Sequence, residues 1–416
     1  MLDINFIREN LELCKAAAKN KNREVEWDNL LKTDEERRGF IKKINGLRAE
    51  RNMVSAKRTP GNESRGKELK KELKSLEDKL RKNEKLFDTL MLTVPNVPDK
   101  SVPVGIDSSG NKVVKTWGDI PKFTFPHKDH IQLARDLDLI DFERGTKVGG
   151  FRVYFLKNEA AQLEFAVLFF TFQKLIGKGY TPLIAPSLVK EFTLIGNGQF
   201  PWGREEVYRV DADDVYLAGT AEVPVTAYYS GEVLDEKVLP RKFVAFSPCF
   251  RREAGSYGKD TKGVYRLHQF SKVEQVIISN NDLNNSFTLH EELLRNSEEI
   301  LQNLQIPYRV LLMCTGDMGE PQVKKYDVEA WMPGRGNYGE TMSNSVMGDF
   351  QARRLKIRYR SKHGSINYCH TLNNTAIASP RILVAILENY QQKDGSVKVP
   401  NVLVPLIGKE VIKPKL

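Results

Sequence analysis

Residues 27–90 hold the feature that most restricts how this chain folds: two apolar runs with alternating steps of four and three residues. The second run is the longer one and consists of Leu69, Leu73, Leu76, Leu80, Asn83, Phe87 and Leu90. The first consists of Phe40, Ile44, Leu47, Arg51 and Val54. This spacing places a seam along one side of a helix, as in a coiled coil. Between the runs, Thr59-Pro60-Gly61-Asn62 is typical of a turn and cannot continue a helix. The pattern predicts an antiparallel helical hairpin over residues 27–90.

The predicted hairpin is also the most basic part of the chain. It has 18 Lys and Arg against 12 Asp and Glu, so it carries +6 of the net charge of +10. Basic residues near its tip can neutralise phosphates of a nucleic acid and release counterions. They are Arg51, Lys57, Arg58, Arg65, Lys67, Lys70 and Lys71. The alternative is a solvated hairpin whose lysines only maintain solubility, and the charge pattern by itself leaves both interpretations open.

The length of 416 residues favours two domains. A Pro-rich stretch follows the hairpin and is typical of a linker. Its prolines are Pro95, Pro98, Pro103, Pro121 and Pro126. We place the boundary within it, which gives an N-terminal domain over residues 1–105 and a larger domain over residues 106–416.

Several classes of protein are excluded by composition. The longest apolar run, residues 165–170, is far shorter than the ~20 residues of a membrane span. Charges break up the N-terminus, so it has no apolar core of a signal peptide, and we expect a soluble, cytoplasmic protein without a membrane partner. The cysteines are far apart, without a C-x-x-C pair, which argues against a disulfide scaffold and a structural zinc site. They are Cys14, Cys249, Cys314 and Cys369.

The region after residue 130 mixes strands and helices without strict βαβ alternation. Strand-like runs cover residues 151–156, 180–184, 243–247, 273–278 and 308–313, and helical patterns cover 158–177 and 282–304, with Asn158 as an N-cap. This order favours an α+β domain built around a largely antiparallel sheet.

Two glycine motifs resemble nucleotide-binding loops, and neither has the right context. Gly334-x-Gly336-x-x-Gly339 leads into no helix start that would hold a pyrophosphate. Gly61-x-x-x-x-Gly66-Lys67 has Glu68 in place of Ser or Thr and lies in the hairpin turn. We reject both as phosphate sites.

A basic, Gly-rich loop at residues 250–263 is the more informative segment. Arg251, Arg252 and Arg266 can grip a triphosphate with bidentate guanidinium groups. Glu253 can accept from an adenine amine, and Phe270 can stack on a base. An isolated Phe-Arg-x-Glu is more often a surface ion pair, so the motif needs support from elsewhere in the chain.

That support comes from a resemblance over nearly the whole length. The loop resembles motif 2 of the class II aminoacyl-tRNA synthetases, and the chain is similar to the bacterial-type seryl-tRNA synthetases. The matching segments are residues 1–3 and 8–10, the hairpin, residues 180–186 (motif 1), 219–222, 250–263, 266–270, 272–274, 340–343, 349–354, 370–375, Arg381 and residues 387–390.

The resemblance implies an antiparallel-sheet catalytic domain preceded by an N-terminal coiled-coil arm. It implies an enzyme, a serine–tRNA ligase that uses ATP and Mg²⁺ to form seryl-adenylate and pyrophosphate. The seryl group then passes to the 3′ end of serine tRNA, and to selenocysteine tRNA where a cell has it. The resemblance further implies that the arm grips the long variable arm of the tRNA and that motif 1 builds a homodimer.

The resemblance also implies roles for individual residues. The catalytic set is Arg251, Arg381 and Glu340. The ATP-binding set is Arg251, Arg252, Glu253, Leu267, Phe270, Glu340, Thr341, Met342, Ser343 and Arg381. The serine-binding set is Thr220, Ala221, Glu222, Arg251, Glu274 and Thr375. Glu340 and Ser343 hold Mg²⁺ with ATP. Arg252, Thr341 and Met342 depart from the usual pattern of the family, as do residues 345–347.

Two alternatives remain open at this point. One is a catalytically reduced paralogue that uses the fold to bind RNA or protein, which the intact Arg251, Glu253, Glu274, Glu340 and Arg381 set disfavours. The other is an ATP-dependent amino-acid:carrier-protein ligase, which the long basic hairpin disfavours. Serine-dependent ATP–pyrophosphate exchange, followed by charging of tRNA, separates the three.

Overall fold

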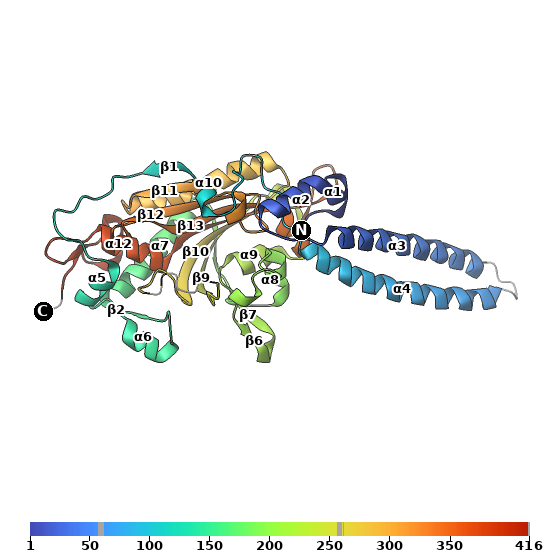
Figure 1. Ribbon diagram of the computed structural model, residues 1–416, viewed down its shortest axis with the longest axis horizontal. Helices are drawn as coiled ribbons and strands as arrows, with labels where there is room; N and C mark the ends of the chain where they lie inside the picture. The colour runs from blue at the N-terminus through green and yellow to red at the C-terminus, as the bar shows by residue number, and fades with distance from the viewer. Residues whose placement is uncertain (57–61, 256–259, 261, 415–416) are drawn as a thin grey trace. The chain divides into compact units, whose positions relative to one another are not determined.

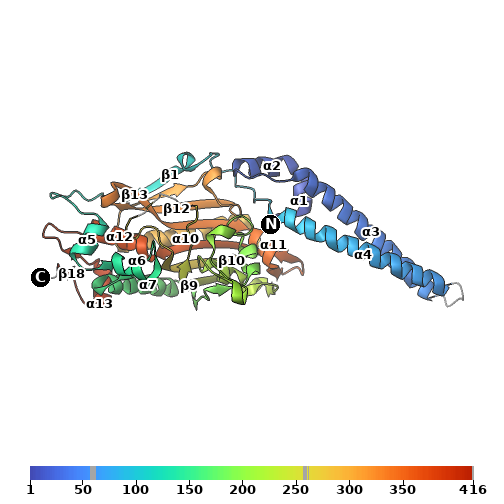
Figure 2. The same cartoon turned by 60° about the horizontal axis from the view of Figure 1, so that its bottom comes forward.

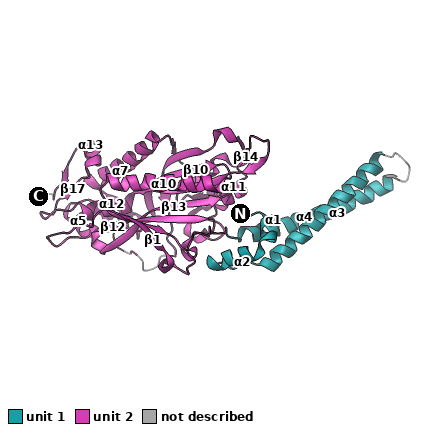
Figure 3. Ribbon diagram, turned by 90° about the horizontal axis from the view of Figure 1, so that it is seen from above, with its two compact units in different colours: residues 1–95 teal, residues 96–416 magenta. Residues whose placement is uncertain are grey.

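The computed structural model describes residues 1–56, 62–255, 260 and 262–414. The chain divides into a unit of residues 1–95 and a unit of residues 96–416 (Figure 3). This division precedes the boundary after residue 105 that the Pro-rich stretch predicts. The amide of Asn96 donates to the carbonyls of Pro321 (2.9 Å) and Met347 (2.8 Å), and the carbonyl of Pro103 accepts from the N–H of Thr315 (3.0 Å). Residues 96–105 are therefore held by the larger unit rather than serving as a linker.

The smaller unit contains the predicted helical hairpin. Its helices are α1 (Ile4–Glu9), α2 (Leu11–Asn20), α3 (Trp27–Ala56) and α4 (Asn62–Leu92), and α3 and α4 lie side by side (Figure 1). Ile44, Leu69 and Leu73 are buried in the seam, as the spacing predicts. Arg51, by contrast, is exposed rather than part of the seam. The turn residues 59–61 lie outside the described residues.

The larger unit is built on an eight-stranded sheet. Every neighbouring pair is antiparallel except β4 and β9, which confirms the predicted α+β class. In spatial order the strands are β1 (Lys112–Trp117), β11 (Tyr308–Leu312), β12 (Lys324–Met332), β13 (Asn337–Gly348), β16 (His370–Ala378), β10 (Gln269–Ser279), β9 (Arg241–Phe250) and β4 (Thr181–Ile184).

Shorter strands form small sheets at the periphery. They are β2 (Ile140–Asp141), β3 (Phe155–Leu156), β5 (Leu188–Val189), β6 (Arg209–Val210), β7 (Val215–Leu217), β8 (Val233–Asp235), β14 (Arg358–Arg360), β15 (Ile366–Tyr368), β17 (Val397–Lys398) and β18 (Val411–Ile412). The helices of this unit are α5 (His130–Asp136), α6 (Phe142–Gly149), α7 (Asn158–Gly177), α8 (Glu191–Asn197), α9 (Glu222–Thr226), α10 (Leu283–Asn303), α11 (Phe350–Leu355), α12 (Ser379–Asn389) and α13 (Val404–Ile407).

The sheet separates a helical core from the site, because side chains alternate between its two faces. On β10, Val273 and Ile277 join a core cluster with residues of α7, α10 and α12, which pack against the sheet (Figure 2). Their neighbours Lys272 and Glu274 point the other way and line a cavity. The period of two along one strand thus supplies both the hydrophobic core and the polar site.

Three local predictions have clear outcomes. The strand expected at residues 151–156 is only β3, Phe155–Leu156. Asn158 is not the N-cap of α7: Lys157 holds that position, and the Asn158 amide donates to the carbonyl of Asp138 at 2.7 Å. The Gly334 motif covers the turn between the antiparallel strands β12 and β13 and the first residues of β13, which agrees with its rejection as a dinucleotide site. Within the described ranges, no helix combines the length and apolarity needed to cross a bilayer.

Candidate active site

One cavity of about 290 Å³ brings together most of the predicted site residues. They come from β10, β13, β16, the starts of α9 and α12, the residues just before α9, and the segment between β9 and β10. The predicted residues in its lining are Thr220, Glu222, Arg251, Glu253, Leu267, Phe270, Glu274, Glu340, Thr341, Met342, Ser343, Thr375 and Arg381.

Two residues of the predicted ATP-binding and serine-binding sets are not in the lining of this cavity. Arg252 follows Arg251 as the chain leaves β9, and its side chain lines a separate cleft. Its N–H donates to the carbonyl of Glu206 (2.9 Å), which fixes the backbone there. The lining of the cavity therefore gives no support to the expected ATP contact of Arg252, which stays a prediction. Ala221 is fully buried and packs with Phe243 in the core, so it shapes the wall of the site without facing it.

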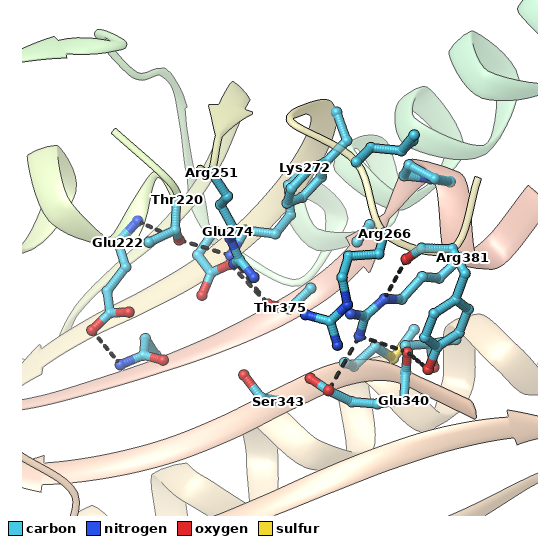
Figure 4. A pocket seen from close by; sticks show the side chains of 18 of the residues that line it. Thr220, Glu222, Arg251, Arg266, Lys272, Glu274, Glu340, Ser343, Thr375 and Arg381 are labelled. Atoms are coloured by element: carbon cyan, nitrogen blue, oxygen red, sulfur yellow. Dashed lines mark hydrogen bonds and ion pairs between the residues drawn. The ribbon is translucent and has the colours of Figure 1, made fainter. Parts of the chain in front are cut away.

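Arg251 and Arg266 enter the cavity from the segments around the basic loop (Figure 4). The Nε of Arg251 donates to the carbonyl of Gly219 at 3.2 Å, and its guanidinium carbon lies 5.2 Å from the centre of the Phe270 ring. Arg266 donates to the carboxylate of Glu253 at 2.7 Å. These bonds hold both guanidinium groups in place, while further N–H donors remain for an anionic ligand.

Arg381 reaches the same cavity from the first turn of α12. Its Nε donates to the carbonyl of Tyr265 (3.2 Å), and its Nη1 donates to the carbonyl of Glu340 (2.9 Å). The Arg381 guanidinium also lies over the Tyr265 ring, 4.5 Å from its centre. With Arg251 and Arg266, this makes three fixed guanidinium groups directed into one cavity, an arrangement suited to a polyphosphate.

Glu340 supplies the negative charge among these cations. Its Oε2 lies 3.1 Å from Nη1 of Arg381. Burial alone would raise the pKa of this carboxyl, but Arg381, Lys325 and Arg251 outweigh that effect, and the pKa of Glu340 lies well below its usual range. Glu340 is therefore ionised at neutral pH. Ser343 lies further along β13 and lines the cavity with it (Figure 4).

The same cavity also holds a buried polar cluster that we call the Lys272 cluster: Thr220, Lys272, Glu274 and Thr375. Lys272 pairs with Glu274, and both residues are no more than 3 % exposed. The ammonium of Lys272 also donates to Oγ1 of Thr220 at 2.7 Å. The hydroxyl of Thr375 donates to Glu274 at 3.1 Å. The cluster gives a small ligand hydrogen-bonding groups whose positions are fixed.

Glu222 lies beside the Lys272 cluster. Its Oε1 accepts from the side-chain amides of Asn197, Gln351 and Asn373, each at 2.9 Å. Burial, and next the negative charge of Glu274, raise the pKa of Glu222 above its usual value. Three amide donors on one oxygen fix this side chain and leave its second oxygen for other partners.

Sequence reasoning assigned no role to several residues in the lining, among them Lys272, Asn373, Lys325 and Gln199. For two of them a signal exists. Lys272 lies two residues before Glu274 on one strand, and Asn373 lies two before Thr375 on another, so each pair shares a face. Lys325 and Gln199 are distant in sequence from every quoted motif, and no spacing rule identifies them.

The basic residues proposed for the hairpin lie in the smaller unit. Arg65, Lys67, Lys70 and Arg51 are exposed. Arg65 is engaged within the hairpin, at 2.7 Å from Glu50 and 3.2 Å from Glu68. Lys57 and Arg58 lie outside the described residues.

Comparison with known proteins agrees with this arrangement. Residues 1–98 match the family model of the seryl-tRNA synthetase N-terminal domain, and residues 206–390 match that of the tRNA synthetase class II core domain (G, H, P, S and T). The chain is 44 % identical over 420 residues to the serine–tRNA ligase of Deinococcus radiodurans, covering 99 % of both chains.

Solved structures show the same likeness. A seryl-tRNA synthetase from Pyrococcus horikoshii complexed with ATP matches with a TM-score of 0.93 and 41 % identity, over the full length of both chains. A cytoplasmic serine–tRNA ligase from Naegleria fowleri in complex with AMP matches with a TM-score of 0.90 and 34 % identity, over 100 % of this chain and 99 % of the other. By these matches over its whole length, the chain belongs to the seryl-tRNA synthetase family.

Proposed function

We propose that this chain activates L-serine with ATP and transfers the seryl group to tRNA, as a serine–tRNA ligase, in the cavity described above. In the first step the serine carboxylate attacks the α-phosphorus of ATP. A carboxyl-oxygen-to-phosphorus bond forms, the bond to pyrophosphate breaks, and seryl-adenylate results. In the second step a hydroxyl of the terminal tRNA adenosine attacks the seryl carbonyl carbon and AMP leaves. Neither step needs a side-chain nucleophile, so positioning and electrostatic stabilisation carry the catalysis.

ATP occupies the end of the cavity with the three guanidinium groups. Arg251 binds the α-phosphate, where negative charge develops, and Arg381 binds the γ-phosphate. Phe270 stacks on the adenine and Glu253 accepts from its amino group. Residues 340–343, with Leu267, line the remainder of the nucleotide site. Because the existing hydrogen bonds already hold these guanidinium groups, they need little reorganisation when the phosphates arrive.

Serine occupies the end with the Lys272 cluster. Its ammonium group needs a carboxylate, which Glu222 or Glu274 offers, and its small hydroxyl needs fixed partners, which Glu274 and Thr375 offer. Lys272 balances the charge of Glu274 in this buried site, so the two carboxylates do not face each other alone. Thr220 and Arg251 complete the contacts between the amino acid and ATP.

The residues present fit a magnesium ion bound together with ATP. Glu340 is an ionised carboxylate and Ser343 a hydroxyl, both lining the cavity, and such oxygen ligands are the ones Mg²⁺ prefers. When bound, the ion neutralises phosphate charge.

The hairpin and one exposed face of the larger unit serve the macromolecular partners. The hairpin α3–α4 binds the long variable arm of serine tRNA, and of selenocysteine tRNA where a cell has it.

A homodimer forms through the surface of α7 and the edge strand β4. Phe165 and Phe169, one helical turn apart, are 77 % and 53 % exposed, and Ile184 is 76 % exposed. Large exposed apolar side chains, here on a helix surface and on an open sheet edge, favour a partner of the same kind.

The observation that carries the proposal is that one cavity holds three fixed guanidinium groups together with the buried Lys272 cluster. The test is serine-dependent exchange of pyrophosphate into ATP, followed by charging of serine tRNA. We expect both activities, each requiring serine. Exchange without tRNA charging would favour the carrier-protein ligase. The absence of both activities would favour the catalytically reduced paralogue.

A further inference from the structure

The short helix α11 lies behind the active cavity. It belongs to the segment of residues 349–354, and this described segment supplies no side chain to the lining of the cavity. It packs against α8 and β16. Its Gln351 is fully buried, with 0 % of its surface exposed. A polar side chain in such a place needs a partner for each donor and acceptor, so the partners of Gln351 indicate what the helix holds.

Every polar group of the Gln351 side chain is engaged. Its Nε2 donates to Oε1 of Glu222 and to the carbonyl of Asn197, each at 2.9 Å. Its Oε1 accepts from the hydroxyl of Thr371 at 2.6 Å. The oxygens of Glu222 and Asn197 are both acceptors, so they require the NH₂ end of the amide and fix the direction in which it points. Gln351 thus joins Glu222, which lines the cavity, to α8 and β16.

The strand that supplies the predicted serine site also supplies the support behind it. Thr371, Asn373 and Thr375 lie two residues apart on β16, so they share one face of the sheet. Asn373 and Thr375 line the cavity, whereas Thr371 is fully buried and bonded to Gln351. The position of Gln351 is therefore coupled to the same strand face that forms the site.

The end of α8 is held by α11 as well. Nη1 of Arg354 donates to the carbonyls of Ile195 (2.8 Å) and Phe200 (3.0 Å). Asn197 lies between these two contacts, and its side-chain amide donates to Oε1 of Glu222 at 2.9 Å. Through Gln351 and Arg354, α11 thus fixes two of the three amides from which this carboxylate accepts.

The ionised form of Glu222 depends on these amide donors. Burial raises the pKa of its carboxyl, and the negative charge of Glu274 raises it further. The amides of Gln351 and Asn197 and the ammonium of Lys272 act in the opposite direction. Among the described residues, β10 therefore faces Glu222 with one carboxylate and one ammonium, and α8, α11 and β16 face it with amides.

We propose that Gln351 is a positioning residue for serine activation, which aims the Glu222 carboxylate at the ammonium group of serine. The inference rests on the proposed function and assigns that ammonium group to Glu222 rather than to Glu274. Glu274 is already paired with the ammonium of Lys272. Glu222 accepts from neutral amides, which orient the carboxylate but leave its negative charge for a cationic ligand.

The test measures the dissociation constant of L-serine by titration calorimetry at several pH values, and KM for ATP in pyrophosphate exchange, with the full chain. Gln351→Met keeps the length of the side chain but removes the donor. Gln351→Asn keeps a buried amide that is one methylene group shorter, and it replaces Gln351→Met if that variant does not fold. The control is Ala352→Gly, which weakens the same helix at the next buried position without changing a polar group.

We expect Gln351→Met to weaken serine binding by roughly 10–100-fold, the scale of one hydrogen bond to a charged group, and Gln351→Asn by roughly three- to tenfold. KM for ATP should stay within twofold. Serine binding needs ionised Glu222, and loss of an N–H donor raises the pKa of this carboxyl. Serine affinity should therefore begin to fall at a higher pH in Gln351→Met than in the unaltered protein, as the pH is lowered. Ala352→Gly should lower the melting temperature but leave serine affinity and its pH dependence unchanged.

Serine affinity within twofold of normal in the Gln351 variants would overturn the inference. An equal rise in KM for ATP, or an equal loss of serine affinity in Ala352→Gly, would also overturn it, because either would show a general disturbance of the unit. Calorimetry keeps the inference separate from the proposed function. An unaltered protein that binds serine without pyrophosphate exchange would refute the proposed function alone, and one that binds no serine would refute both.

Discussion

The hairpin and the active cavity are both rich in positive charge, but they hold it in opposite ways. Lys67 and Lys70 on α4 are exposed to water, whereas Lys272 on β10 is 3 % exposed and bonded to the side chains of Glu274, Thr220 and Thr375. An exposed charge interacts weakly and is screened by salt, while a buried charge requires fixed partners to offset its desolvation. We therefore expect substitutions in the cavity to act strongly and individually, and substitutions in the hairpin to act weakly and cumulatively.

The largest expected effect concerns the choice of amino acid in the cavity. Alanine lacks the hydroxyl that Thr375 and Glu274 are proposed to bind, and a buried site that loses such a partner can discriminate by about 10⁴–10⁵. Serine should exceed alanine by that order in kcat/KM for pyrophosphate exchange. Thr375→Val should lower the ratio of kcat/KM for serine to kcat/KM for alanine by roughly 10–100-fold, because it removes one buried hydrogen bond to a charged group.

Thr375→Ser is the matched control, since it keeps the hydroxyl, and it should retain most of the discrimination. Alanine activated within tenfold of serine by the unaltered protein would mean that the serine site lies elsewhere.

The next effect concerns the phosphate end of the cavity. Arg381→Ala removes one fixed cation and should lower the rate of serine-dependent exchange by about 10²–10³, the scale of losing one preorganised electrostatic contact. The exchange rate of Arg381→Lys should lie between those of Arg381→Ala and the unaltered protein, because an ammonium keeps the charge but loses the bidentate geometry. Arg360→Ala, a change of the same kind on the surface, should leave the rate within twofold. Near-normal exchange by Arg381→Ala would remove this residue from the ATP site.

The two regions also differ in how far sequence alone could predict them. The hairpin follows from local spacing, because each helix buries its own seam and the spacing is visible along the chain. Only Arg51 departs from it: the alternating steps include it, but a long charged side chain reaches water instead. Prediction of the cavity required recognisable motifs, because its residues come from strands far apart in sequence.

Within those motifs, adjacency was misleading where side chains diverge. Arg251 and Arg252 are neighbours in the sequence, yet they line different clefts. Lys325 reaches the cavity from β12, which no motif covered, and its effect on the pKa of Glu340 depends on how β12 and β13 are paired. Such residues become visible only when the sheet is assembled.

A third prediction separates the two regions physically. Replacing residues 40–85 by a short Gly/Ser loop removes the outer part of α3 and α4 while leaving the larger unit untouched. Exchange should stay within twofold of normal, whereas KM for tRNA in charging should rise by roughly 10–100-fold through the loss of phosphate contacts.

A normal KM for tRNA would mean that the hairpin is only a solvated structure without a role in tRNA binding. Loss of exchange would mean that the hairpin supports the catalytic unit. Thermal unfolding of the shortened protein, followed alongside the assays, shows whether the larger unit remains folded.

The smallest effect concerns single charges on the hairpin. Cations without an ion pair are expected to contribute more to tRNA binding than cations that are already paired. Lys67 and Lys70 have no ion pair with any described residue, whereas Arg65 is already paired with Glu50 and Glu68. If free cations near the tip contact tRNA phosphates, Lys67→Gln and Lys70→Gln should each raise KM about two- to threefold and lower its log–log salt slope by about one. Arg65→Gln should change the slope less, because its charge is partly neutralised before tRNA arrives. Lys85→Gln, at the opposite end of α4, is the matched control for total charge. Equal slopes for Lys85→Gln and Lys67→Gln would show that the hairpin attracts tRNA by its overall charge rather than through contacts at its tip.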